Sequence, residues 1–183
     1  MTSLSTKFMQ NSLITRFGEL AYFVNVKTLG TNTDGSFNSC SNLQYTDTSN
    51  VTYITGGTGS TGSTGSPFGY TSIVELNLPN LTRISQYALK PNGNNSNTPR
   101  PLLRVTIGDK FTTISNQYAF AYPQNAVFKI LATTPPAGST LARIGCKSTT
   151  YMYVPDASVD DYKAASAFAN WASYIKPLSE CPW

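Results

Sequence analysis

The side chains that could perform acid, base or nucleophilic chemistry are few in this sequence. Its 183 residues include no histidine and only 9 aspartates and glutamates, so such chemistry would have to use carboxylates, lysines, tyrosines or cysteines. The one close acidic group is Asp160-Asp161, with Asp156 nearby. Adjacent residues at a helix start do not face each other, unlike the opposed carboxylates of a glycosidase. We therefore predict no catalytic residue and expect these aspartates to stabilise a helix start.

Metal, phosphate and cofactor sites have no better support. The cysteines lack the spacing of metal ligands, and the Gly-Ser-Thr run within 56–66 lacks the Lys-Ser or Lys-Thr that closes a phosphate loop. We predict no cofactor and no metal. Cys40 and Cys146 are expected to be small buried hydrophobes, and a disulfide between Cys146 and Cys181 is the alternative. The isolated aspartates are expected to be turn residues: Asp34, Asp47 and Asp109.

Aromatic side chains are the remaining candidates for function. The chain has 11 tyrosines, 9 phenylalanines and 2 tryptophans, and tyrosine supplies rigid area with a polar tip, which suits a carbohydrate-stacking or protein-binding face. The alternative is that most of them belong to the core and its rim. Trp183 is a further candidate, for packing against a partner or a neighbouring copy. No binding residue is assigned; the tyrosines considered are Tyr45, Tyr53, Tyr70, Tyr118, Tyr122 and Tyr151.

Charge and hydropathy exclude several classes of partner. Net charge is +4 and charged residues make up 12% of the chain, but the basic residues are scattered singly instead of forming a run, so we predict no nucleic-acid binding. No stretch of about 18 apolar residues is present, so we predict no membrane insertion. The first residues lack the charged start and apolar core of a signal peptide, and we expect either no export by that route or a leader already removed.

Two stretches of the sequence repeat each other. Strands with one buried face are expected at 73–78, 103–107 and 127–131, where apolar and polar residues alternate. The first two are followed by similar segments, Ile84-Ser85 with Tyr87-Ala88-Leu89, and Ile114-Ser115 with Tyr118-Ala119-Phe120. A degenerate copy begins at Val26-x-x-Leu29. The spacing from Val105 to Phe128 gives a unit of about 23 residues, expanded in some copies by loops.

These repeats predict a mainly-β fold, a leucine-rich-repeat-like solenoid of short stacked strands with a C-terminal helical cap. We expect a docking or extension segment at 1–13, the solenoid at 14–154 and the cap at 155–183. Expanded loops are expected at 31–36, 56–66 and 90–101. In the cap, Ser158 is the expected N-cap of a helix whose apolar residues continue to Ile175 and which Pro177 stops.

The repeat and the tail together resemble the BspA-type leucine-rich-repeat family of gut Bacteroidetes and their bacteriophages. The resemblance rests on 84–89 and 114–120, on the opening coil 14–23, and on the Phe37-x-x-Cys40-x-x-Leu43 turn. It is most specific in the tail, at 153–165 with Trp171 and 175–180.

This resemblance implies a non-enzymatic protein. The first hypothesis is a bacteriophage virion structural or binding protein, a capsid or tail appendage, fibre or decoration, located on the virion and acting in host attachment. Its expected partners are other virion proteins, a second copy of itself as a homo-oligomer, or a host surface glycan or protein. The alternative is a fragment of a bacterial cell-surface adhesin, which would be extracellular, and the third hypothesis is a glycan-active enzyme.

Overall fold

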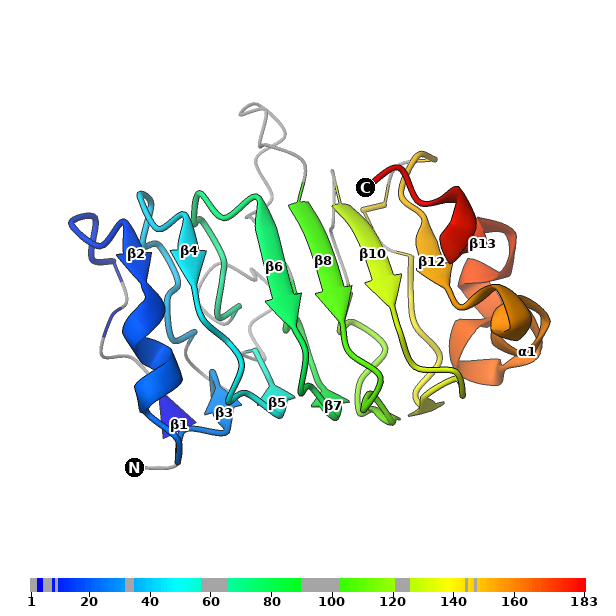
Figure 1. Ribbon diagram of the computed structural model, residues 1–183, viewed down its shortest axis with the longest axis horizontal. Helices are drawn as coiled ribbons and strands as arrows, with labels where there is room; N and C mark the ends of the chain where they lie inside the picture. Colours follow the sequence, from blue (N-terminus) through cyan, green and yellow to red (C-terminus); the bar gives the residue numbers. More distant parts are fainter. Residues whose placement is uncertain are drawn as a thin grey trace.

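The strands of this protein form three parallel sheets. A computed structural model describes residues 3–4, 8, 10–31, 35–56, 66–89, 103–120, 126–143, 145–146 and 148–183. Within these residues, all strand pairs are parallel. Figure 1 shows the strands side by side along an elongated molecule, with the helices of the carboxyl-terminal region at one end.

The first sheet has six strands in the order β1-β3-β5-β7-β9-β11. Its members are very short: β1 (Ser3–Leu4), β3 (Thr28–Leu29), β5 (Tyr53–Ile54), β7 (Arg83–Ile84), β9 (Thr113–Ile114) and β11 (Ala137–Gly138).

The second sheet has five strands in the order β13-β12-β10-β8-β6. They are β6 (Glu75–Leu78), β8 (Leu103–Ile107), β10 (Ala126–Ile130), β12 (Met152–Val154) and β13 (Ile175–Pro177). The third sheet pairs β2 (Arg16–Phe17) with β4 (Tyr45–Thr46), and β4 lies beside β6.

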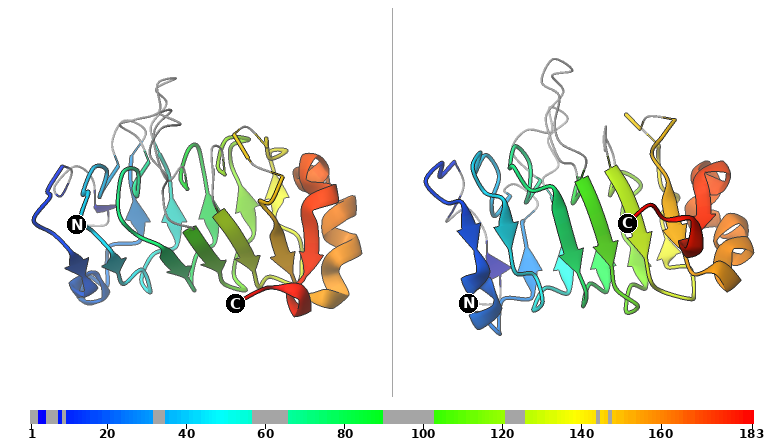
Figure 2. Two further views of the ribbon diagram at one scale, coloured as in Figure 1. Left: turned by 90° about the horizontal axis from the view of Figure 1, so that it is seen from above. Right: turned by 45° about the horizontal axis from the view of Figure 1, so that its top comes forward.

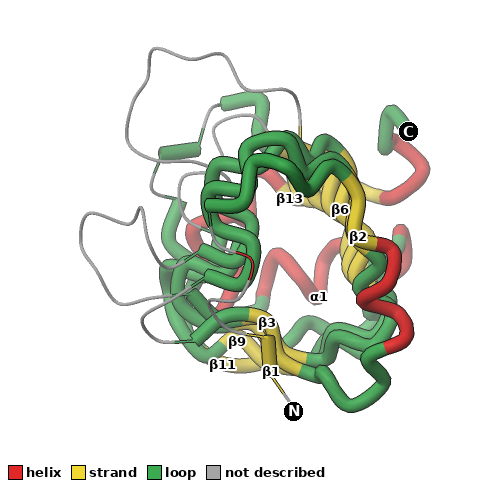
Figure 3. The backbone as a smooth tube through the Cα atoms, turned by 90° about the vertical axis from the view of Figure 1, so that its left-hand side faces the viewer, coloured by secondary structure: helices red, strands yellow, loops and turns green. Residues whose placement is uncertain are grey.

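The chain crosses repeatedly from one sheet to the other. Between β5 and β12, strands of the six-stranded and five-stranded sheets alternate along the sequence. Viewed along the long axis, the two sheets lie on different sides of a common interior (Figure 3). The side views in Figure 2 show the same two rows of arrows. Parallel strands need such crossovers because a hairpin turn can join only antiparallel neighbours.

Buried residues in register connect neighbouring strands across this interior. Leu29, Ile54, Ile84 and Ile114 are successive partners in the six-stranded sheet, and all four are buried. The next position is Gly138, which has φ +130° and whose added Cβ would lie 1.9 Å from the Ile114 carbonyl oxygen, so no larger residue fits there. In the five-stranded sheet the matching inward row is Leu76, Val105, Phe128, Met152 and Ile175.

Threonines before the short strands add a second ladder. The Thr82 hydroxyl donates to the Thr52 carbonyl oxygen at 3.0 Å, and the Thr112 hydroxyl donates to the Thr82 carbonyl oxygen at 3.2 Å. Each pair is 30 residues apart. The side chain thus adds a hydrogen bond to the backbone ladder at the same position of successive units.

Short helices cover the carboxyl-terminal end of the sheets (Figure 1). They are η3 (Asp156–Ser158), α1 (Val159–Ala164), η4 (Ser166–Tyr174) and η5 (Leu178–Glu180). Trp171 of η4 is fully buried with its ring edge-on to Phe128 at 6.1 Å between centroids, and the Tyr162 hydroxyl of α1 donates to the Ala132 carbonyl oxygen at 2.8 Å. The remaining short helix, η2 (Gly18–Tyr22), follows β2 near the other end.

The fold class predicted from the sequence, a leucine-rich-repeat-like solenoid of short stacked strands with a C-terminal helical cap, is wrong. The structure has parallel sheets of six, five and two strands with few helices, an α/β-like arrangement. The prediction placed Ile84 and Ile114 only in the segments that follow the expected strands. Both lie in two-residue strands of the six-stranded sheet, which is separate from the sheet of β6, β8 and β10. The alignment of the repeats does agree with the strand register, because Ile84 pairs with Ile114 and Val105 pairs with Leu76 and Phe128.

The predicted single helix of the tail is also wrong. Ser158 does occupy the N-cap position of α1, but its side chain makes no capping hydrogen bond. Ala165 is extended, with φ −68° and ψ 129°, and separates α1 from the 3₁₀ helix η4. Ile175 then begins strand β13, which pairs with β12.

Some predicted features lie outside the described residues. They are 32–34, 57–65 and 90–101 of the predicted loops, together with Asp34 and Tyr122. Of the predicted segment 1–13, Ser3 and Leu4 form β1 and pair with Thr28 and Leu29.

Candidate binding face

The outward side of the five-stranded sheet carries a row of polar, cationic and aromatic residues. The cross-strand partners are Asn77, Thr106, Lys129, Tyr153 and Lys176. They alternate with the buried inward row because successive residues of a strand point to opposite faces. The parallel sheet therefore fixes the backbone that carries this row.

Aromatic rings hold the cations of this row in place. The Lys129 Nζ lies 4.1 Å from the centroid of the Trp183 ring and donates a hydrogen bond to the Trp183 carbonyl oxygen. The Arg104 guanidinium carbon lies 5.8 Å from the same ring. Further along, the Lys176 Nζ lies 4.8 Å from the Tyr151 ring centroid. These are cation–π distances, at which the ring quadrupole attracts the charge.

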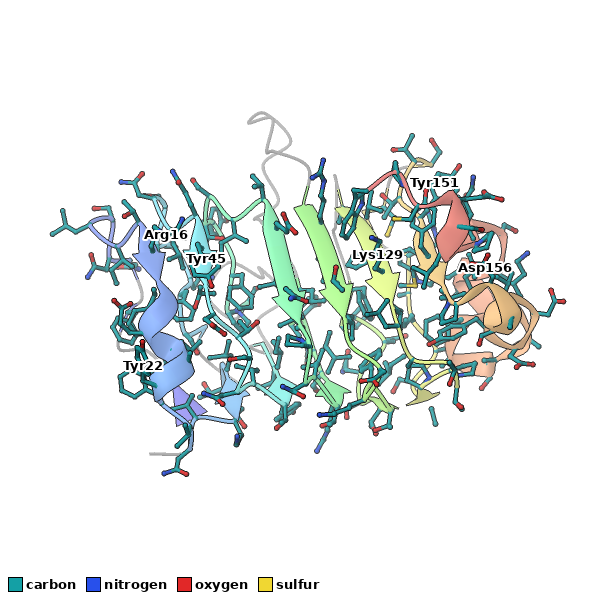
Figure 4. The ribbon with its side chains drawn as sticks, viewed as in Figure 1. Arg16, Tyr22, Tyr45, Lys129, Tyr151 and Asp156 are labelled. Carbon is teal, nitrogen blue, oxygen red and sulfur yellow. The ribbon has the colours of Figure 1, made fainter. Side chains whose placement is uncertain are left out.

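We call this surface the aromatic-cation face. Tyr151 joins its tyrosines, with ring centroids 6.4 Å from Tyr153 and 6.2 Å from Tyr174. Figure 4 shows Lys129 and Tyr151 on the side of the molecule formed by β10 and β12. The face consists of Arg104, Lys129, Tyr151, Lys176 and Trp183, together with Tyr153, which is itself buried.

The face carries more positive than negative charge. The ion pair between Lys176 and Glu180, 3.2 Å from Nζ to Oε2, is the only one within the described ranges. The hydrogen bond from Lys176 to Glu180 raises the pKa of the lysine, and burial raises the pKa of the Tyr153 hydroxyl. At neutral pH the lysine is therefore charged and the tyrosine neutral. Glu75, which is the cross-strand partner of Arg104, is the other carboxylate near the face.

The candidate tyrosines of the sequence do not form one face. Tyr45 lies under the Arg16 guanidinium at 4.5 Å, in the sheet of β2 and β4, and Tyr53 lies under that of Arg83 at 4.7 Å, in the six-stranded sheet. Tyr118 stacks on Tyr87, with centroids 5.5 Å apart. Figure 4 shows Tyr45 and Tyr151 near opposite ends of the molecule.

The other candidates are placed as follows. Tyr70 is half-buried with φ 57° in a turn. Trp183, the candidate considered besides the tyrosines, contacts Lys129 as described above. Lys129 and Arg104 were not predicted as members of the face, although the alternation in 103–107 and 127–131 points both residues outward.

The acidic residues lie at helix starts and in turns. Asp160 and Asp161 are in the first turn of α1. Asp156 begins η3 and accepts a hydrogen bond from the Ser179 backbone N–H at 3.1 Å. Hydrogen bonding from the Ser179 side chain, and next from its backbone, lowers the pKa of the carboxyl group. Asp47 accepts from the Ser49 N–H at 2.8 Å, and Asp109 lies in the turn after β8. Within the described ranges, no three His, Cys, Asp or Glu residues gather as they would around a metal ion.

The three cysteines are free thiols, so the alternative of a Cys146–Cys181 disulfide is not realised. Cys40 is fully buried, as expected, and Cys146 is half-buried. Burial raises the pKa of the Cys146 thiol to about 11. A thiol with so high a pKa is a poor nucleophile at neutral pH.

Comparison with known proteins supplies no relative for this chain. No family model matches it, and no curated protein is significantly similar to it. The resemblance to the BspA-type family therefore stays a prediction. None of the helices that the structure describes has the length and apolar character needed to cross a lipid bilayer.

Proposed function

We propose that this chain is a non-enzymatic structural and binding protein of a bacteriophage virion, a capsid or tail appendage. It would present the aromatic-cation face to the host surface or to a neighbouring subunit. The observation that carries the proposal is this face itself, an outward sheet surface where Arg104 and Lys129 lie over the Trp183 ring. Lys176 lies over the Tyr151 ring and also pairs with Glu180.

The residue types of the face suit binding to a large partner, such as a glycan or a protein. Arginine, tyrosine and tryptophan are the residues most enriched at energetically important interface positions. Trp183 and Tyr151 offer rigid area that needs little ordering on binding, and Lys129 and Arg104 add positive charge beside it. Such a surface fits an anionic glycan or the acidic patch of a protein better than a neutral sugar, because cations already lie over the ring faces.

Location on a particle is the first test. Antibodies against the protein should label purified phage particles in immuno-electron microscopy, and the gene should lie among capsid, portal or tail genes. Label confined to a bacterial envelope, with a lipoprotein signal in the native gene, would instead establish the adhesin alternative.

Binding through the face is the second test. Wild-type protein and a Lys129→Ala/Trp183→Ala variant would be titrated onto Bacteroidetes cells and onto isolated anionic capsular polysaccharide. We expect at least about a tenfold loss of affinity in the variant, since buried interface residues of this kind contribute about 2 kcal/mol. Lys163→Ala is the matched control, because Lys163 is an exposed lysine on α1, outside the face.

Two outcomes would contradict the proposal. Equal affinities of the face variant and the control would remove the face from binding. Turnover of the polysaccharide that is lost in an Asp160→Asn/Asp161→Asn variant would show that the protein is an enzyme.

A further inference from the structure

The two ends of the row of strands differ in how they are covered. At the carboxyl-terminal end α1 and η4 lie over the sheets, with Tyr162, Phe168 and Trp171 fully buried beneath them. The Leu141 N–H donates to the Ala167 carbonyl oxygen at 2.8 Å, and the Asn170 side-chain N–H donates to the Leu141 carbonyl oxygen at 3.0 Å. The helices therefore cover the apolar side chains of this end and are joined to the rest of the chain by hydrogen bonds.

The amino-terminal end carries most of the large apolar side chains that are exposed. Leu13 is 88% exposed, Tyr22 84%, Val24 59% and Phe23 43%. We call these four residues the amino-terminal patch. Figure 4 shows Tyr22 at the end of the molecule opposite the covering helices. Single exposed apolar residues need no explanation, but three of these four, Tyr22, Phe23 and Val24, are consecutive in the chain, and exposed apolar residues that lie together mark an interaction site.

The edge strands at this end are β1 and β2, whereas the edge strands at the other end are β11 and β13, of which β13 contacts α1 and η3. In the described part of the chain, β2 pairs only with β4, and β1 pairs only with β3. An edge strand offers unpaired N–H and C=O groups to another strand, and natural proteins usually cover or block such edges. One kind of partner would cover both the apolar patch and the open edge, namely another strand with apolar side chains beside it.

The charges around the patch favour a second copy of the same chain as that partner. Arg16 on β2 and Glu19 at the start of η2 are both exposed and have opposite signs. In a two-fold interface, residue i of one copy meets residue j of the other, and the reverse contact forms as well. Under two-fold symmetry the cation beside the patch of one copy therefore meets the anion beside the patch of the other copy. A partner with a strong charge of one sign would instead place a like charge beside either the cation or the anion.

We propose that two copies of this chain form a closed dimer through their amino-terminal ends. The edges of β2 lie antiparallel across the two-fold axis, the amino-terminal patch is buried, and Arg16 of each copy faces Glu19 of the other. Because a two-fold interface uses the same surface of both copies, the association stops at two copies instead of growing into a filament. This inference does not depend on the virion assignment or on what the aromatic-cation face binds.

Sedimentation equilibrium of the intact protein tests the proposal with a matched pair of substitutions. Val24→Asp places a charge inside the patch, and Val74→Asp places the same charge at an exposed valine outside it, where Val74 is 46% exposed. We expect wild type and Val74→Asp to dimerise at concentrations up to about 100 μM. For Val24→Asp we expect a dissociation constant at least about tenfold higher.

A charge reversal adds a second readout. Glu19→Arg should weaken the dimer, and Arg16→Glu/Glu19→Arg should restore it, because the double variant exchanges the two signs. Circular dichroism should show that every variant has the wild-type fold. A wild type that stays monomeric over this range, or equal effects of Val24→Asp and Val74→Asp, would overturn the proposal.

Discussion

Positive side chains in this protein rest on aromatic rings more often than on carboxylates. Arg143 is the most enclosed example, with its guanidinium carbon 3.3 Å from the Tyr174 ring centroid and 4.7 Å from that of Trp171. With few carboxylates in the chain, tyrosine and tryptophan are the available partners for arginine, and a guanidinium stacks on them at little desolvation cost. Salt therefore weakens these cation–π contacts less than it weakens surface ion pairs.

The Cys146 thiol should react slowly at mildly alkaline pH. With a pKa of about 11, its thiolate fraction at pH 8 is on the order of one in a thousand, against about a quarter for an ordinary thiol. Higher intrinsic nucleophilicity offsets part of this, which leaves a disulfide-exchange rate about tenfold below that of a free thiol. The measurement is reaction with an aromatic disulfide in a Cys181→Ser variant, since Cys40 is fully buried. A rate equal to that of a free cysteine peptide would contradict the assigned burial.

At the scale of elements, very short strands and helices are fixed by their neighbours. A two-residue strand such as β7 cannot be stable alone, and it persists because Ile54 and Ile114 flank Ile84 in register. In the same way η3 and η5 are joined by the hydrogen bond from Ser179 to Asp156. Each element therefore depends on contacts supplied by residues distant in the sequence.

The Asp156 contact should make the stability of the carboxyl-terminal end depend on pH. The folded-state pKa of Asp156 lies below its ordinary value, so the stabilisation is fully present above the unfolded-state pKa and is lost as pH falls through the folded-state pKa. We expect Asp156→Ala to lower Tm at pH 7 and to have little effect at about pH 2.

Thermal unfolding followed by circular dichroism at both pH values measures this difference. Asp156→Asn is the control, because it keeps an acceptor oxygen without the charge and should show a smaller loss at pH 7. A Tm difference that persists unchanged at the acidic pH would contradict the role of the carboxylate.

The sequence predicts the elements with clear periodicity and fails where elements are too short to have any. Alternation located β6, β8 and β10, and the repeat placed Ile84 opposite Ile114. The two-residue strands show no alternation of their own, so the six-stranded sheet was not predicted. The copy of the repeat that includes Val51 to Ile54 was not predicted either. Residues 50–54 have the same Asn-x-Thr-x-Ile pattern as residues 80–84, and this match could have identified the copy.

The tail shows the same limit for helices. Phe168, Trp171 and Tyr174 recur every third residue, which fits a 3₁₀ helix better than an α-helix. Over one or two turns the two periods are nearly the same, so the apolar spacing alone predicted one continuous helix. For the candidate face, the sequence supplied Tyr151 and Trp183, but which cation meets which ring depends on cross-strand register and on the path of the last residues.

At the scale of the whole molecule, the buried residues form one continuous core. The cluster runs from Leu4 through the paired rows of both sheets to Trp171 and Ile175. Because the end helices and the sheets both contribute to this cluster, they share their apolar contacts. We therefore expect the folded chain to unfold as one unit.

Ile84→Ala tests this coupling. Removing a fully buried isoleucine side chain should cost about 2 to 5 kcal/mol and lower the urea concentration at the midpoint of a single transition. Urea unfolding would be followed by circular dichroism, which reports the sheets, and by the fluorescence of Trp171 in a Trp183→Phe background, which reports the end helices. Val74→Ala, at an exposed position, should cost about 0.5 kcal/mol or less. Two separate transitions would show that the end helices unfold independently.

The threonine ladder has a consequence for how the gene can change. Its members recur at an interval of 30 residues, so an in-frame loss or duplication of a block of that size would bring the surroundings of Thr82 and Thr112 together without altering which residue types meet. Recombination between the similar coding segments would then shorten or lengthen the protein by one such block at a time. The two ends of the protein, which are covered differently, would stay unchanged.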